Sequence, residues 1–145
     1  WLDKNENYCP DIILQLRPTQ PKRKIEDINV CLDLFIAYLS QYDSLRTVVE
    51  FDKSPYKMYR IDEQTKQPML KPLFQSVDDI LVEPYNQCRQ YLPKTYLHNG
   101  YIDILKTSLI KDGKLSGERI YPYVMRKTDT IDIDTMEDWE KAECH

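Results

Sequence analysis

The chain has 145 residues, of which 41% are hydrophobic and 11% aromatic, so it is long enough to bury a core of ordinary size as one domain. Its formal net charge is −4 with both signs intermingled, which argues against a nucleic-acid backbone as the main partner because phosphate contacts need a basic stripe. No apolar run approaches the length of a bilayer-spanning helix, and no basic segment followed by an apolar one marks a signal peptide.

The tyrosines and cysteines give further indications about binding surfaces and the cellular environment. The eleven tyrosines fit either a binding cleft or interface or a tyrosine-rich strand surface, and composition leaves both open. The cysteines lack zinc-finger and CxxC spacing and are too few to suggest a disulfide scaffold, so we expect a reducing, cytoplasmic context. These cysteines are Cys9, Cys31, Cys88 and Cys144.

The first half of the chain reads as alternating strands and a helix. An apolar run at 11–16 predicts a buried strand that ends in the proline-containing loop 17–21. Apolar residues then recur at helical spacing over 25–41, and further strands are expected at 44–51 and 56–61. A strand, a helix and a strand form a right-handed βαβ unit, so the predicted class is α/β with a mainly parallel sheet. Ligands bind beyond the carboxyl ends of such strands, which places loop 17–21 at the functional edge.

The second half begins with a long excursion. Residues 62–93 contain several prolines and little periodicity, and loops of that length are usually functional or involved in assembly. Thr135 and Asp138 have the spacing of a capping box, which predicts a helix start. The remaining predicted elements are strands at 101–105, 120–125 and 130–134 and a final helix at 136–143.

Asp132 and Asp134 are candidates for a metal site. They are two apart in a β-prone stretch, so both side chains are expected on one face of a strand beside a helix N-terminus. Two carboxylates held in this way can bind a hard divalent cation, and magnesium also bridges to substrate phosphate. The alternative is an exposed strand edge followed by a helix cap, and the pattern alone leaves it open.

Several cations could bind an acidic substrate. Arg89 and Lys94 flank a turn, and Lys57 and Arg60 are expected on a strand that ends near the same edge. Arginine makes bidentate contacts to carboxylate or phosphate, although each cation taken alone is more commonly a solvated surface residue. His98 is the only internal histidine, and no serine or cysteine has an evident His/Asp partner by spacing, so a nucleophilic hydrolase is not expected. The pattern favours a reaction in which the substrate supplies its own hydroxyl nucleophile.

Five motifs occur in an order that resembles a known enzyme family. The chain resembles the acylneuraminate cytidylyltransferases, also called CMP-sialic acid synthetases. The resemblance implies a Rossmann-like α/β domain that transfers CMP from CTP to a sugar acid with magnesium and releases pyrophosphate. The motifs are Arg17-Pro18-Thr19-Gln20-Pro21, Pro55-Tyr56-Lys57-Met58, Arg89-Gln90-x-Leu92-Pro93, Asn99-Gly100-x-Ile102 and Ile131-Asp132-Ile133-Asp134-Thr135.

The resemblance also implies roles for single residues. Asp132 and Asp134 would hold Mg²⁺, and Arg89 and Lys57 would be catalytic residues close to the substrate's charged groups. The residues implied in substrate binding are Arg17, Gln90, Asn99 and Asp103. The family typically dimerises around this part of the chain, so we expect a homodimer formed through 62–100.

Three departures concern the sugar. Arg17 replaces the family's more familiar glutamine, Gln20 replaces the usual serine, and Asp103 stands where many sialate-specific members have tyrosine. These changes leave open a sialic acid, a legionaminic- or pseudaminic-type acid or Kdo, or another nucleotide, with the sialate group ranked first.

The largest departure from the family pattern is a missing motif. The family's glycine-rich phosphate loop has no counterpart in this sequence, which contains three glycines. The chain also lacks an initiator methionine and reaches an apolar strand within its first dozen residues. We therefore expect residues 1–145 to be a single, partial nucleotidyltransferase domain whose N-terminal part is missing. The alternative from another class is a non-catalytic fragment or dimerisation module of the same fold.

Overall fold

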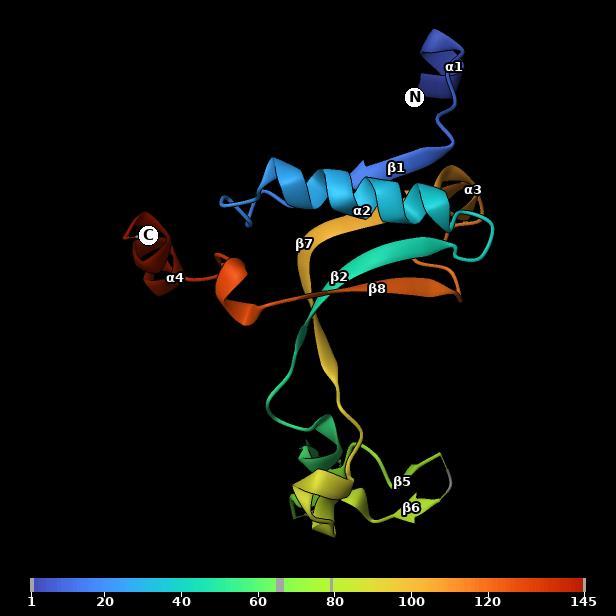
Figure 1. Cartoon of the computed structure of the whole chain (residues 1–145). Coiled ribbons are helices and arrows are strands. Elements are labelled where there is room, and N and C mark those ends of the chain that lie inside the picture. Colours follow the sequence, from blue (N-terminus) through green and yellow to red (C-terminus); the bar gives the residue numbers. More distant parts are fainter. Residues whose placement is uncertain (1, 65–66, 79, 145) are drawn as a thin grey trace. The chain divides into compact units, whose positions relative to one another are not determined.

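The chain divides into two compact units (Figure 1). The computed structural model describes residues 2–64, 67–78 and 80–144. Unit 1 consists of Trp1–Val49 and His98–His145, and unit 2 consists of Glu50–Leu97. Unit 2 begins before the predicted excursion 62–93 and ends just after it.

Unit 1 is built on a four-stranded sheet with the order β1-β7-β2-β8. Strand β1 pairs antiparallel with β7, and β2 pairs parallel with β8. Strand β7 is antiparallel to β2. The Lys106 N–H donates to the Asp43 carbonyl and the Ile102 N–H donates to the Thr47 hydroxyl, so the residue number falls along β7 as it rises along β2. The strands are β1 (Ile12–Gln15), β2 (Ser44–Glu50), β7 (Tyr96–Lys106) and β8 (Ile120–Met125).

The mainly parallel sheet predicted from the sequence is only partly correct. Strands β1, β2 and β8 share one direction, but β7 lies between β1 and β2 and runs the opposite way. The sheet is therefore mixed, and β2–β8 is its parallel pair among the described residues. The reason is that β7 is buried from Asn99 to Leu105, and an apolar run such as 101–105 predicts burial without specifying strand direction.

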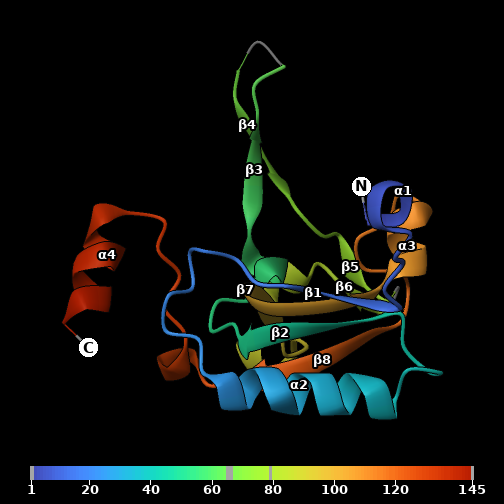
Figure 2. The same cartoon turned by 90° about the horizontal axis from the view of Figure 1, so that it is seen from above.

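Helix α2 (Ile25–Ala37) covers one face of this sheet (Figures 1 and 2). It contributes Cys31 and Phe35 to the core, and both are fully buried. The other core residues come from the strands and are Leu45, Val49, Tyr101, Ile102, Ile104 and Met125. The remaining helices of unit 1 are α1 (Leu2–Glu6), α3 (Thr107–Lys111), the 3₁₀ turn η4 (Lys127–Asp129) and α4 (Met136–Glu143). None of the helices described here is long and apolar enough to cross a bilayer.

Most predicted elements of unit 1 are present. Strands β1, β2 and β8 and helices α2 and α4 occur at or close to their expected positions. The capping box at α4 is confirmed, because the Asp138 N–H donates to the Thr135 hydroxyl while the Thr135 N–H donates to the Asp138 carboxylate.

The strand predicted at 130–134 is wrong. The Ile133 N–H donates to the Thr19 carbonyl at 2.9 Å, but no strand ladder forms in this described stretch. The alternation of isoleucine and aspartate favours an extended backbone, and a strand additionally needs a partner strand along its length.

Unit 2 consists of short elements. The predicted strand at 56–61 is partly wrong, because Pro55 begins a 3₁₀ turn that includes Lys57, and the strand starts only at Tyr59. Proline favours the first position of a helical turn since its φ is already fixed there. The elements are η1 (Pro55–Lys57), β3 (Tyr59–Asp62), β4 (Met69–Pro72), β5 (Ser76–Val77), β6 (Leu81–Val82), η2 (Pro84–Asn86) and η3 (Arg89–Tyr91).

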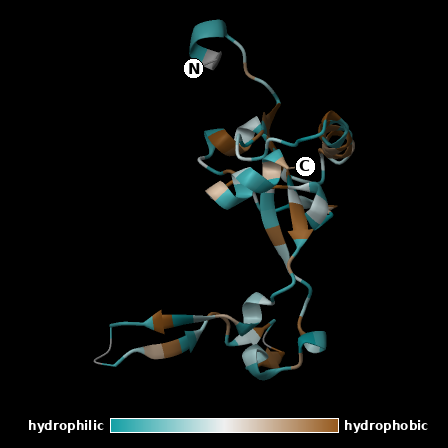
Figure 3. Ribbon diagram, turned by 90° about the vertical axis from the view of Figure 1, so that its left-hand side faces the viewer, coloured by the Kyte–Doolittle hydropathy of each residue, from teal (hydrophilic) through white to brown (hydrophobic). Residues whose placement is uncertain are grey.

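The β3–β4 hairpin has one apolar and one largely polar face. Opposite residues of an antiparallel pair share a face, and so do residues two apart along a strand. Ile61 therefore lies with its partner Leu70, and these side chains are 61% and 68% exposed. Arg60 and Asp62 lie on the other face, where Asp62 forms an ion pair with Lys71. Figure 3 shows the resulting alternation of apolar and polar segments.

Candidate functional site

A bend in β7 organises the polar residues of unit 1. Gly100 has φ +64°, a left-handed conformation that glycine adopts without strain. The buried Asn99 side chain holds the bend, because its Oδ1 accepts from the Thr47 hydroxyl at 2.7 Å and from the Tyr101 N–H at 3.2 Å. The Gln20 amide donates to the Asn99 carbonyl at 2.7 Å. The bend is thus fixed from β2, from β7 itself and from the loop that follows β1.

The bend brings His98 and Asp103 together. In a regular strand, residues five apart lie roughly 17 Å from each other and point to opposite faces. Here the His98 Nε2 lies 2.8 Å from the Asp103 Oδ1. The contact is possible because the strand changes direction at Gly100 between the two residues.

Two arginines approach the same carboxylate. The Arg46 Nε lies 3.5 Å from the Asp103 Oδ1, and the Arg17 Nη2 lies 3.9 Å from the Oδ2. The Arg17 side chain passes over Gly100, where an added Cβ would lie only 2.8 Å from the Arg17 Cδ. The Asp103 side chain is 7% exposed, whereas Arg17, Arg46 and His98 are 26% to 43% exposed. We call these four residues the Asp103 cluster.

The loop between β1 and α2 is held against β7 by Tyr101. The Arg23 Nε donates to the Tyr101 carbonyl, and its Nη2 donates to the Arg17 carbonyl. The Tyr101 hydroxyl accepts from the Lys24 N–H and donates to the Asp27 carboxylate. Burial and the hydrogen bond to Asp27 raise the pKa of Tyr101 to about 12. The hydroxyl therefore stays a donor, and the loop carrying Arg17 has a fixed position.

Asp132 and Asp134 lie beside this loop. Both are exposed and alternate with the half-buried Ile131 and Ile133 in the segment that leads into α4. The Ile133–Thr19 backbone bond joins the segment to loop 17–21. No group of three or more metal-binding side chains occurs among residues 2–64, 67–78 and 80–144. Two carboxylates nevertheless fit magnesium, which takes one or two protein carboxylates and completes its shell with water and substrate phosphate.

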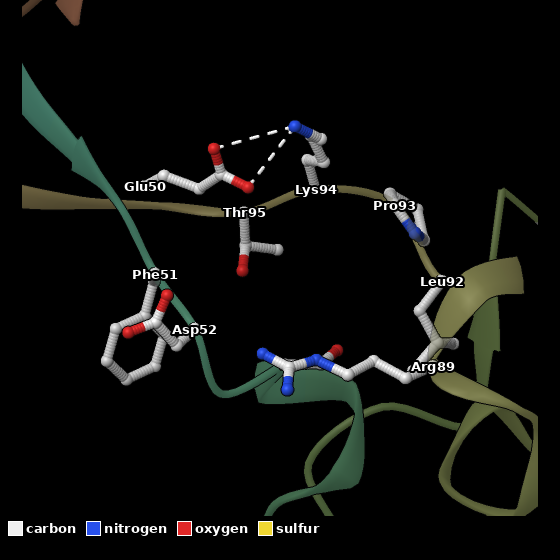
Figure 4. A pocket seen from close by; sticks show the side chains of 9 residues that line it. Glu50, Phe51, Asp52, Arg89, Leu92, Pro93, Lys94 and Thr95 are labelled. Atoms are coloured by element: carbon white, nitrogen blue, oxygen red, sulfur yellow. Dashed lines mark hydrogen bonds and ion pairs between the residues drawn. The ribbon is translucent and has the colours of Figure 1, made fainter.

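Unit 2 contains a polar pocket of about 100 Å³ next to η3 (Figure 4). The Arg89 side chain extends into it, and the Lys94 Nζ forms an ion pair with Glu50 at 3.2 Å on its opposite side. Arg89 also lines an adjoining hollow together with Lys57. The full pocket lining is Glu50, Phe51, Asp52, Ser54, Arg89, Leu92, Pro93, Lys94 and Thr95.

The residues singled out from the sequence fall into two groups. In unit 1, Arg17 contacts Asp103, while Asn99 holds the bend and Asp132 and Asp134 lie beside the Arg17 loop. In unit 2, the structure brings Arg89 and Lys57 to one hollow, and Gln90 is exposed and lines neither hollow. The prediction that Lys57 and Arg60 lie on one strand is wrong, because Lys57 lies in η1 and Arg60 lies in β3 of the hairpin.

Arg46 was missed from the sequence, and His98 was noted without a partner. A signal existed for Arg46, because a charged residue between the buried Leu45 and Thr47 of a strand needs a counter-ion or solvent. The His98–Asp103 contact had no such signal, since the spacing of five is unfavourable in a straight strand.

The chain shares its fold with an enzyme of solved structure. No family model and no curated protein sequence matches it significantly. The structure of CMP:2-keto-3-deoxy-manno-octonic acid synthetase complexed with CTP matches over 99% of this chain with a TM-score of 0.55 and 13% sequence identity. The chain spans 64% of the length of that synthetase. The fold of this chain is therefore that of the sugar-acid cytidylyltransferase, over about two thirds of the enzyme's length.

Proposed function

We propose that the chain is the sugar-acid-binding part of a nucleotidyltransferase that transfers CMP from CTP to a sialic acid or a similar 2-keto sugar acid. The observation that carries the proposal is the fold shared with a CTP-bound CMP-Kdo synthetase along nearly the whole chain. The order of the five sequence motifs supports the same activity independently of the fold. The sialate motifs and the Kdo enzyme's fold favour different sugars, and a panel of acids separates them.

Unit 1 would supply the loop and the acidic segment of the active site. Loop 17–21 is fixed by Gln20 and Arg23, and the backbone of Ile133 fastens the Asp132–Asp134 segment to it. A fixed position matters because correct placement of the reacting groups supplies much of the rate enhancement in group transfer.

Unit 2 would supply cations for the substrate's negative charges. Arg89 presents a planar guanidinium in the pocket beside η3, and Lys57 presents an ammonium at the adjoining hollow. Arginine suits a carboxylate through two parallel hydrogen bonds, while lysine acts as a point charge on phosphate.

The reaction needs no nucleophile from the protein. A hydroxyl oxygen of the sugar acid bonds to the α-phosphorus of CTP and loses its proton to water. The bond between the α-phosphorus and the oxygen that bridges to the β-phosphate breaks, and pyrophosphate leaves with that electron pair. Asp132 and Asp134 would hold Mg²⁺, which when bound neutralises phosphate charge in the transition state. Arg89 and Lys57 would orient the acid and its reacting hydroxyl.

A second candidate is a non-catalytic dimerisation module. It is favoured by the apolar face of the β3–β4 hairpin, formed by the exposed Tyr59, Ile61 and Leu70 and the half-buried Pro72. A two-stranded hairpin is marginal in water and gains stability when its apolar face is covered. The homodimer proposed for the enzyme would cover the same face, so dimerisation alone does not separate the candidates.

The test is pyrophosphate release by the full-length protein from CTP and magnesium with N-acetylneuraminate, Kdo and legionaminic- and pseudaminic-type acids. We expect release with one preferred acid and little with ATP, GTP or UTP. A folded, dimeric protein that releases none with any acid and nucleotide would contradict the enzyme and favour the module.

A further inference from the structure

We propose that Asp103 is a positioning residue that holds Arg17, Arg46 and His98 as a binding site for an oxyanion of the substrate. The inference rests on the proposed function for the identity of the substrate, but the site itself can be tested without catalysis. It assigns Asp103 a role different from the direct substrate contact expected from the sequence, and it adds Arg46 to the site.

Asp103 is poorly placed to contact a ligand. Its side chain is buried, and its Oδ1 is already approached by the His98 Nε2 at 2.8 Å and the Arg46 Nε at 3.5 Å. The Arg17 Nη2 approaches Oδ2 from the loop after β1. A carboxylate surrounded in this way orients its partners and leaves little room for a further contact.

The three partners of Asp103 are better placed than Asp103 itself to contact a ligand. Arg17, Arg46 and His98 come from a loop and from two adjacent strands, and each stays partly exposed. Two guanidinium groups face one carboxylate, so the Asp103 cluster has a formal charge of at least +1. Its two arginines contact Asp103 at 3.5 Å and 3.9 Å, distances longer than those of a tight charged hydrogen bond, and therefore retain N–H groups for another acceptor.

The geometry depends on Gly100. A side chain at this position would collide with Arg17, and the positive φ of Gly100 brings His98 back toward Asp103. Both features act on the same cluster, so the bend in β7 assembles a charged site that a straight strand could not form.

The ligand chemistry is an oxyanion, and two parts of the substrates carry one. The carboxylate of the sugar acid and the phosphates of CTP would both be attracted by the surplus positive charge. Titrations with each substrate alone distinguish these sources, and inorganic sulfate serves as a probe that does not depend on catalysis.

The first experiment follows the His98 ring by ¹H–¹⁵N NMR in the full-length protein, with the signal assigned through His98→Gln. Sulfate, each sugar acid and CTP are titrated separately. We expect a saturable shift with sulfate and with one of the two substrates, and an about tenfold weaker Kd in Asp103→Asn. This direction is diagnostic, because a purely electrostatic role predicts tighter anion binding once the negative charge is removed.

The matched control is Asp43→Asn, which removes a half-buried carboxylate that also pairs with an arginine, Arg119, in unit 1. It should bind each anion as the wild type does. If Asp103→Asn does not fold, Arg46→Gln takes its place, since Arg46 is partly exposed and its loss should also weaken binding about tenfold.

The outcomes separate the two proposals. Saturable binding that is weakened in Asp103→Asn supports the positioning role, even if no acid supports pyrophosphate release. No shift of the His98 ring with any of these anions, or equal or tighter binding in Asp103→Asn, overturns the inference even if the enzyme is active.

Discussion

The two units differ in how their side chains are covered. Unit 1 has a sheet and a helix that bury a common core, from Phe35 in α2 to Ile104 in β7. In unit 2 the buried apolar side chains are Val77, Pro84 and Leu92 within the described residues, while Ile61 and Leu70 are mostly exposed. Unit 1 therefore has the core of a stable fold, whereas unit 2 has an apolar surface that needs a cover.

The difference also separates the proposed tasks. Unit 1 holds its polar residues in fixed positions through buried hydrogen bonds, as for Asn99 and Tyr101. Unit 2 presents Arg89 and Lys57 on short 3₁₀ turns. Removing a residue from unit 1 should mainly affect stability, turnover or anion binding at the Asp103 cluster, and removing one from unit 2 should mainly affect association or binding of the sugar acid.

The largest expected effect tests the core of unit 1. Phe35→Ala should lower the free energy of unfolding by about 3–5 kcal/mol, because it deletes a fully buried ring. Leu70→Ala in unit 2 should change the monomer's stability by less than about 0.5 kcal/mol, since Leu70 is exposed. Denaturant unfolding measures both, and sedimentation should show that Leu70→Asp weakens the dimer. Equal losses of stability for Phe35→Ala and Leu70→Ala would refute the contrast between the units.

The next effect concerns turnover. Asp134→Ala in the full-length protein should lower kcat by about 100-fold or more, because the metal acts mainly on charge in the transition state. Its melting temperature should hardly change, since Asp134 is exposed. The matched control is Asp112→Ala, an exposed carboxylate after α3. Unchanged turnover in Asp134→Ala would remove the metal assignment.

A smaller effect is expected on substrate affinity in unit 2. Arg89→Lys should raise KM for the sugar acid about tenfold and leave KM for CTP unchanged, because the bidentate contact of the guanidinium is lost. Steady-state kinetics with each substrate varied in turn measure this. Arg60→Lys, on the polar face of the hairpin, serves as the control. An unmoved KM for the acid would make Arg89 a structural residue.

A further effect, confined to alkaline pH, is a pH dependence of stability in unit 1. Because the pKa of Tyr101 is raised to about 12, the folded state keeps a proton that the unfolded chain loses above pH 10. Stability from this group is complete below pH 10 and falls as the pH rises toward 12, by at most about 1.4 kcal/mol per pH unit.

Tyr101→Phe tests this pH dependence, because it removes the group that titrates. Urea unfolding between pH 9 and pH 11 should show a shallower alkaline loss of stability in the variant than in the wild type. Parallel curves would show that Tyr101 does not titrate differently in the folded state.

The sequence predicted the positions of helices and strands better than it predicted which strands pair and in which direction. Apolar patterns located α2, β2 and β8, because each of these elements packs one side against the core, and the capping box located α4. The apolar patterns could not give the direction of β7, and they took Ile131 and Ile133 for a strand when they lie in a segment without a ladder.

The sequence predicted many residues of the candidate site but not the contacts between them. Arg89 and Lys57 meet at one hollow, and Arg17 lies beside Asp103. The Asp103 cluster depends on the left-handed conformation of Gly100. The bend there lets His98 contact Asp103, although residues five apart on a straight strand point to opposite faces. An Asn-Gly pair inside an apolar strand is a signal for such a bend, but the partners that the bend creates come from three-dimensional packing.

Transfer of CMP to a sugar acid can be followed by ³¹P NMR of the full-length protein with CTP, magnesium and the sugar-acid panel. The three CTP signals should disappear together and be replaced by one phosphodiester signal and pyrophosphate, only when the preferred acid is present. Unchanged CTP with every acid, or conversion to CDP and phosphate, would contradict this transfer.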